Sequence, residues 1–80
     1  MVTPDLLRDY ISKGIAAEVL QVSGDGQHFE ALIVSEAFEG MNRVRRHQAV
    51  YAVLGDRMRE EIHALSMKTL TPEEWKAAGG

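Results

Sequence analysis

The 80-residue sequence contains no cysteine. Disulfide bonds are therefore excluded, and so is a metal site built from thiolates of this chain alone. Histidine remains as a metal ligand type to consider, with further ligands supplied by another molecule. A chain without cysteine is compatible with a cytoplasmic protein, and that is the location we expect.

Long hydrophobic runs and an excess of positive charge are also missing. No apolar run approaches the roughly 18 to 20 residues that a membrane span needs. Asp5 stands where a signal peptide would have a positive start followed by an apolar run. The net charge is −3, which argues against broad nonspecific nucleic-acid binding but leaves room for a local basic patch. We expect no membrane partner.

Aromatic residues are few, at 6% of the chain, so the core must consist mainly of leucine, isoleucine, valine and alanine. A chain of this size forms one domain, 1–80, and buries only about 60% of the surface that its unfolded state exposes. We expect the tail, 76–80, to fray.

The first half of the sequence predicts a helix followed by a hairpin. Thr3-Pro4-Asp5 has a hydroxyl cap, a proline and an acid in the order typical of a helix start. Gly14 suits a left-handed residue that closes this helix. Two strands are expected at 17–23 and 28–35, joined by Gly24-Asp25-Gly26, a typical hairpin turn. In the second strand, Phe29, Ala31 and Ile33 point to one side.

The second half predicts a long helix, a strand and a short helix. Asn42 is the expected cap of the long helix, whose apolar stripe is Val44, His47, Tyr51, Leu54 and Met58. The third strand is expected at 62–70. Thr71-Pro72-Glu73-Glu74 is a capping box that begins the last helix, and we expect Trp75 to anchor it. The order is α-β-β-α-β-α, an α+β fold with a three-stranded sheet and helices packed on one face.

Catalytic motifs are missing. The sequence has no HExxH motif, no phosphate-binding glycine loop and no defensible Ser–His–Asp set. The acidic pairs Glu60-Glu61 and Glu73-Glu74 are explained by a solvated helix end and by helix capping. Because an 80-residue chain also has little room for a deep pocket, we expect no enzyme.

Three histidines could carry chemistry. His28 follows the hairpin turn and His63 begins the expected third strand, so both could lie near one end of the sheet. Neutral imidazole ligates iron, zinc or copper, yet two histidines alone make an incomplete site. From the residues alone, ordinary surface histidines are the better explanation. His47 falls on the apolar stripe, which predicts a partly buried imidazole with a hydrogen-bond partner.

Several short motifs resemble the BolA family, specifically its short bacterial branch. They are Ile62-His63-Ala64-Leu65-Ser66, Phe38-Glu39-Gly40, and Arg46-His47 followed by Val50-Tyr51. The resemblance covers nearly the whole chain. It implies a type II KH-like fold with mixed strand directions and a short extra helical turn near Phe38–Gly40.

The resemblance also implies a function. BolA proteins form complexes with monothiol glutaredoxins that are bridged by a 2Fe–2S cluster, with sulfur ligands from the glutaredoxin and from glutathione. His63 matches the C-terminal histidine that the BolA side supplies, and His28 matches the ligand position in the loop between the first two strands. The implied role is cluster transfer, storage or sensing. We expect the apo form to be a monomer.

The arginines support an alternative. BolA-like proteins have been linked to DNA binding and transcriptional regulation. Arg43, Arg45 and Arg46 cluster at the start of the long helix, and Lys68 lies on the third strand. The Phe38–Asn42 turn holds only one glycine, so the GXXG clamp of KH proteins is absent. A third option is a protein-interaction module that binds glutaredoxin without needing the cluster or the histidines.

Overall fold

The computed structural model describes residues 2–59 and 62–80, so the pair Glu60-Glu61 lies outside the described residues. The elements follow the order predicted from the sequence, with three short 3₁₀ helices added among the described residues. They are α1 (Pro4–Gly14), β1 (Val19–Gly24), β2 (Phe29–Val34), η1 (Glu36–Phe38), α2 (Arg43–Leu54), η2 (Gly55–Met58), η3 (Ile62–Ala64), β3 (Leu65–Leu70) and α3 (Pro72–Ala77). The helical turn η1 matches the extra turn expected near Phe38–Gly40.

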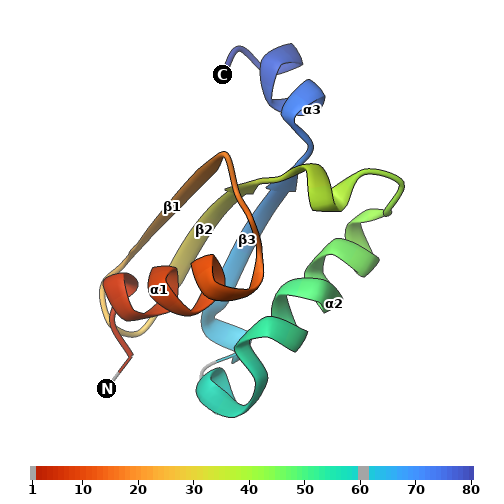
Figure 1. The fold of residues 1–80 in the computed structure, drawn as a ribbon. Coiled ribbons are helices and arrows are strands. Elements are labelled where there is room, and N and C mark those ends of the chain that lie inside the picture. The colour runs from red at the N-terminus through yellow and green to blue at the C-terminus, as the bar shows by residue number, and fades with distance from the viewer. Residues whose placement is uncertain (1, 60–61) are drawn as a thin grey trace.

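The sheet has the order β1-β2-β3. β1 pairs with β2 antiparallel and β2 pairs with β3 parallel, so the predicted mixed three-stranded sheet is confirmed. In Figure 1, α1 lies in front of the strands, α2 lies beside β3, and α3 extends beyond the end of β3. Because Phe29 pairs with Leu65 in the parallel ladder, β2 and β3 begin at the same end of the sheet.

The core lies between the sheet and the helices α1 and α2. Phe29, Ala31 and Ile33 are buried, which confirms the predicted core-facing side of β2. Each helix contributes its buried stripe to the same cluster: Leu7 and Ile11 from α1, Val50 and Leu54 from α2. Full burial of such side chains stabilises the fold by about 1.5–3 kcal/mol each.

The predicted apolar stripe of α2 was wrong at two of the four members whose burial the structure describes. Val44 is 64% exposed and Tyr51 is 38% exposed, whereas Val50 and Leu54 are fully buried. The helix carries apolar residues on two sides, and the sequence pattern alone does not show which side meets the sheet. The structure describes no surroundings for the Met58 side chain.

The third strand begins later than expected. Ile62–Ala64 forms the 3₁₀ helix η3, and β3 starts at Leu65. The correction moves His63 off the strand and into the turn before it. Within β3 the predicted alternation holds, because Leu65 and Thr69 are buried while Ser66 and Lys68 are exposed.

Gly14 does not have the left-handed conformation that the sequence suggested. It is helical, it is absent from the positive-φ residues, and α1 is capped by Ile15 in an extended conformation. Its role is close packing between helices, because a Cβ at Gly14 would clash with Cγ1 of Val53 on α2. Gly55, with φ +57°, closes α2 instead.

We therefore expect Gly14→Ala to destabilise the protein by about 1–3 kcal/mol through overpacking against Val53. Denaturant unfolding of Gly14→Ala, Val53→Ala and the double variant measures the coupling. Gly14→Ala should reduce the unfolding free energy much less in the Val53→Ala background than in the wild type. Equal costs of Gly14→Ala in both backgrounds would contradict the packing explanation.

Trp75 is not the hydrophobic anchor that the sequence suggested. α3 contributes no buried residue, and Trp75 is only partly buried and outside the core cluster. A six-residue helix has too little surface for a buried stripe. Its capping box is confirmed, since Thr71 and Glu74 bond each other's backbone. In the C-terminal tail, the backbone N–H of Gly80 donates to the carbonyl oxygen of Trp75 at 2.9 Å. The expected fraying of the tail stays a prediction.

Candidate metal-ligating histidines and the basic helix

His28 is held at the end of a structured hairpin loop. One carboxylate oxygen of Asp25, Oδ1, accepts the backbone N–H of Gln27 at 2.9 Å and that of His28 at 2.8 Å. These two hydrogen bonds lower the pKa of the Asp25 carboxyl group, and the bond from His28 has the larger effect. The loop thus fixes the backbone of His28 while its side chain remains exposed one residue before β2.

His63 lies in η3, two residues before β3, and is also exposed. The parallel register places Phe29 beside Leu65, so His28 and His63 precede neighbouring strands at one end of the sheet. Neighbouring strands are about 4.8 Å apart. The prediction that both histidines lie near one end of the sheet is confirmed.

The two histidines alone do not make a complete metal site. Among residues 2–59 and 62–80, no three histidine, cysteine, aspartate or glutamate side chains gather in a way that could hold a metal ion. A 2Fe–2S cluster is normally held by four protein ligands. Two exposed imidazoles suit half of such a set, provided that another molecule supplies the rest.

His47 lies away from this end of the sheet. The next residue toward the N-terminus, Arg46, bonds Thr69 near the far end of β3. Burial of the His47 imidazole lowers its pKa, and the charge of Arg43 lowers it further. The predicted partial burial is correct, but the predicted partner is missing: Nε2 of His47 has no hydrogen-bond partner among the described residues.

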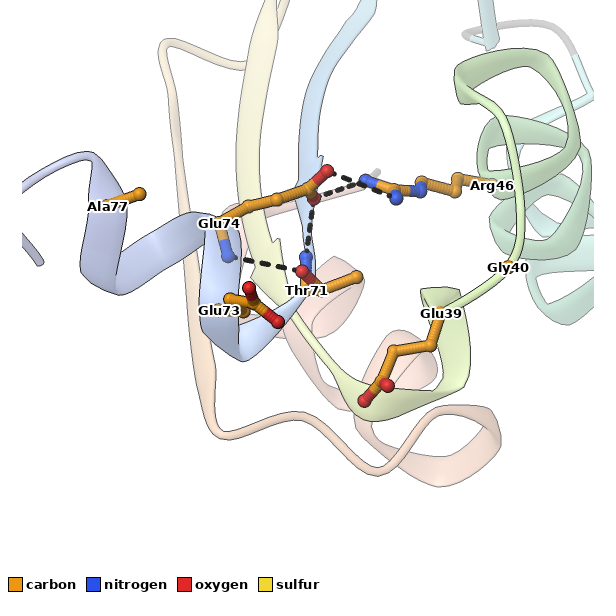
Figure 2. Close-up of a pocket in the computed structure, with 7 residues that line it drawn as sticks. All are labelled: Glu39, Gly40, Arg46, Thr71, Glu73, Glu74 and Ala77. Atoms are coloured by element: carbon orange, nitrogen blue, oxygen red, sulfur yellow. Dashed lines mark hydrogen bonds and ion pairs between the residues drawn. The ribbon is translucent and has the colours of Figure 1, made fainter.

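Arg46 belongs to the interior of the structure, which corrects its prediction as a nucleic-acid contact. Its side chain is only 12% exposed. Nε donates to Met41 O at 2.9 Å, and Nη1 donates to Thr69 O at 3.0 Å and to Glu74 Oε1 at 2.6 Å. Figure 2 shows this guanidinium reaching from α2 to Glu74 on α3. The arginine therefore joins α2, the Gly40 turn, β3 and α3.

The cleft around this ion pair is shallow and acidic. It has a volume of about 470 Å³, and Glu39 and Glu73 line it beside Arg46 and Glu74. In Figure 2 the carboxylate of Glu74 lies between Arg46 and Thr71. The hydrogen bond from Arg46 and the backbone N–H of Thr71 lower the pKa of Glu74 to about 2.

This shift makes the attachment of α3 sensitive to acid. Because the folded-state pKa of Glu74 lies below its unfolded value, near 4.5, ionised Glu74 stabilises the fold above that value. The contribution should be lost as the pH falls from about 4.5 to about 2. The difference in unfolding free energy between wild type and Glu74→Gln should shrink over this range, followed by fluorescence of Trp75, the single tryptophan. Glu73→Gln is the matched control, and a pH-independent difference would contradict the assignment.

The remaining residues predicted to bind nucleic acid do not form one patch. Arg43 and Arg45 are exposed at the start of α2, on the side of the sheet that α1 and α2 cover. Lys68 is exposed and alternates with the core-facing residues of β3, so it points to the opposite face of the sheet. Two arginines remain as a local basic surface.

Sequence reasoning missed the role of Arg46 in holding α3. The capping box assigns Glu74 to the helix start, and Arg46 is one of three arginines that cluster at the start of the long helix. No sequence signal shows that α2 and α3 meet at the end of β3, which is what brings these two side chains together.

The fold is that of a small α+β domain with two exposed histidines at one end of its sheet. The family model described as "BolA-like protein" matches residues 10–74. The chain belongs to the BolA family, as its sequence motifs predicted. Among the described residues, no helix combines the length and apolar character needed to cross a bilayer.

Individual relatives agree with this assignment. The chain is 39% identical over 70 residues to the acid stress protein IbaG of Escherichia coli K12, which covers 86% of this chain and 83% of that protein. It is 44% identical over 54 residues to the DNA-binding transcriptional regulator BolA of Haemophilus influenzae, covering 68% and 52%. The structure of a BolA homologue from Coxiella burnetii matches with a TM-score of 0.83 and 43% identity, covering 95% and 99%.

Proposed function

We propose that this protein is a non-enzymatic accessory protein of iron–sulfur metabolism. It pairs with a monothiol glutaredoxin and shares a bridging 2Fe–2S cluster, with His63 and His28 as its own ligands. The observation that supports this most is the position of the two exposed imidazoles at the start of neighbouring parallel strands. Membership of the BolA family supports the choice of partner.

Each residue has a defined role in this proposal. His63 and His28 present neutral imidazole nitrogens, and Asp25 keeps the backbone of His28 in place. Imidazole in place of thiolate on one iron raises the reduction potential of a cluster, as in Rieske centres. Metal ligands must be deprotonated and a protonated imidazole cannot ligate, so binding of the shared cluster should weaken in acid.

The test is anaerobic reconstitution of the cluster with a monothiol glutaredoxin and glutathione, followed by visible circular dichroism. The proposal predicts a spectrum that differs from that of the glutaredoxin homodimer and saturates at a fixed ratio of the two proteins. An unchanged homodimer spectrum in the presence of excess protein would contradict it.

A second candidate function is DNA-binding regulation through Arg43 and Arg45. It is supported by the name of the Haemophilus influenzae relative and by the exposure of both arginines. It predicts an affinity for duplex DNA that falls steeply with salt and with removal of either arginine. Glutaredoxin binding that survives without cluster and without both histidines would instead favour the third option, an interaction module.

A further inference from the structure

The outward side of α2 carries two large apolar residues that lie outside the core cluster of the described residues. Val44 and Tyr51 are the large hydrophobic residues found exposed among the described residues. They are seven residues apart, which is two helical turns, so they lie on the same side of the helix. Gln48 and Ala52 are exposed on that side as well. We name these four residues the α2 outer stripe.

This stripe is separate from the buried side of the same helix. Val50 and Leu54 face the core, and Figure 1 shows α2 at the outer side of the molecule. Scattered apolar side chains are ordinary on protein surfaces. Here two large ones flank small or flexible neighbours along about 10 Å of helix, at a rise of 1.5 Å per residue. Small neighbours allow another helix to approach closely.

The charge around the stripe indicates the chemistry of its partner. Arg43 and Arg45 are exposed at its N-terminal end, and neither forms an ion pair among the described residues. The sequence from Gly40 to Gly55 contains no acidic residue, although the chain as a whole has a charge of −3. The charge of this region is therefore positive, and a partner surface with negative charge would complement it.

Two other occupants fit the stripe less well. Duplex DNA would meet only two available arginines, because Arg46 is engaged internally and Lys68 faces the other side of the sheet. Duplex DNA would also contact the apolar centre of the stripe. An apolar centre with tyrosine and arginine is typical of protein–protein interfaces, where these residues often dominate the binding energy. A second copy would bring the same arginines to this surface, and like charges at a self-pairing contact repel each other.

We propose that the α2 outer stripe docks an acidic amphipathic helix of a partner protein. Val44 and Tyr51 contact the apolar face of that helix, and Arg43 and Arg45 pair with its carboxylates. This surface includes neither His28 nor His63, so it can be tested independently of cluster sharing.

The probe is a designed 16-residue helical peptide with leucines at i, i+3, i+4 and i+7 and glutamates on its flanks, titrated into ¹⁵N-labelled protein. We expect amide shifts confined to about residues 43–55. Tyr51→Ala and Val44→Ala should each weaken binding at least five-fold, and the Arg43→Gln/Arg45→Gln double variant should remove most of its salt dependence. Leu32→Ala, on the opposite face of the sheet, is the matched control. Because Val44 and Tyr51 are exposed, their replacement should leave the fold intact.

Three outcomes would overturn the proposal. The first is the absence of shifts on the stripe, or equal binding of a peptide with lysine in place of every glutamate. The second is binding of duplex DNA that shifts the same amides, depends on the arginines and ignores Tyr51→Ala. The third is a concentration-dependent shift of the stripe without peptide, which would identify a second copy as the occupant.

Discussion

His63→Ala should abolish the cluster shared with a monothiol glutaredoxin. The visible circular dichroism spectrum of the mixture should revert to that of the glutaredoxin homodimer, with at least a ten-fold loss of the mixed species. The physical reason is that the described residues hold no third metal-binding group near His63 and His28. When one of the two imidazoles is removed, no other described side chain of this protein is placed to take over its bond to iron.

The matched variants separate ligation from folding. His28→Ala should also reduce the yield of the mixed cluster, and comparison with His63→Ala ranks the two ligands. His47→Ala removes a third histidine that lies toward the opposite end of β3, so its cluster spectrum should be retained. All three should be compared at equal folded fraction, since His47 is partly buried. A mixed spectrum that survives in His63→Ala and disappears in His47→Ala would reverse the assignment.

Arg46→Met should destabilise the protein by about 2–4 kcal/mol, because two backbone carbonyls and a carboxylate lose their donor while the site stays largely buried. For a domain of this size, such a loss lowers Tm by roughly 10–25 °C. Urea unfolding followed by circular dichroism measures the loss. Hydrogen exchange at the amides of Trp75 and Ala78, which bond within the α3 turn, should accelerate beyond the global effect.

The control for this experiment lies one residue away. Arg45→Met makes the same chemical change at an exposed position, and it should alter stability by no more than about 0.5 kcal/mol. Arg46→Lys keeps the charge but cannot donate from both ends of a planar group, so an intermediate loss is expected. If Arg46→Met and Arg45→Met were equally mild, Arg46 would have no structural role.

The sequence predicted the fold well where local rules and burial agree. The caps at Thr3, Asn42 and Thr71 are all confirmed by side-chain hydrogen bonds to the expected turns. The alternation in β2 identified its buried face, because one strand side meets the core and the other does not. Helix caps and strand alternation depend on residues that are close in the sequence, so the local sequence pattern is enough to predict them.

The sequence failed where the answer depends on how elements meet. α2 carries apolar residues on two sides, and only packing against the sheet decides that Val50 is buried and Val44 exposed. Arg46 reads as a surface charge until α2 and α3 are brought together. Likewise, the parallel pairing of β2 and β3 is what places His28 and His63 at one end of the sheet. Each of these facts joins segments that are distant along the chain.

The most direct test of the central claim uses isotope labelling of one partner. The mixed complex is prepared from uniformly ¹⁵N-labelled protein and unlabelled glutaredoxin and glutathione, the cluster is reduced, and its nitrogen hyperfine couplings are measured by pulsed electron paramagnetic resonance. The account predicts a strong ¹⁵N coupling of imidazole size that is lost in His63→Ala. A reduced mixed cluster without ¹⁵N coupling, or with an unchanged coupling in His63→Ala, would contradict ligation by His63.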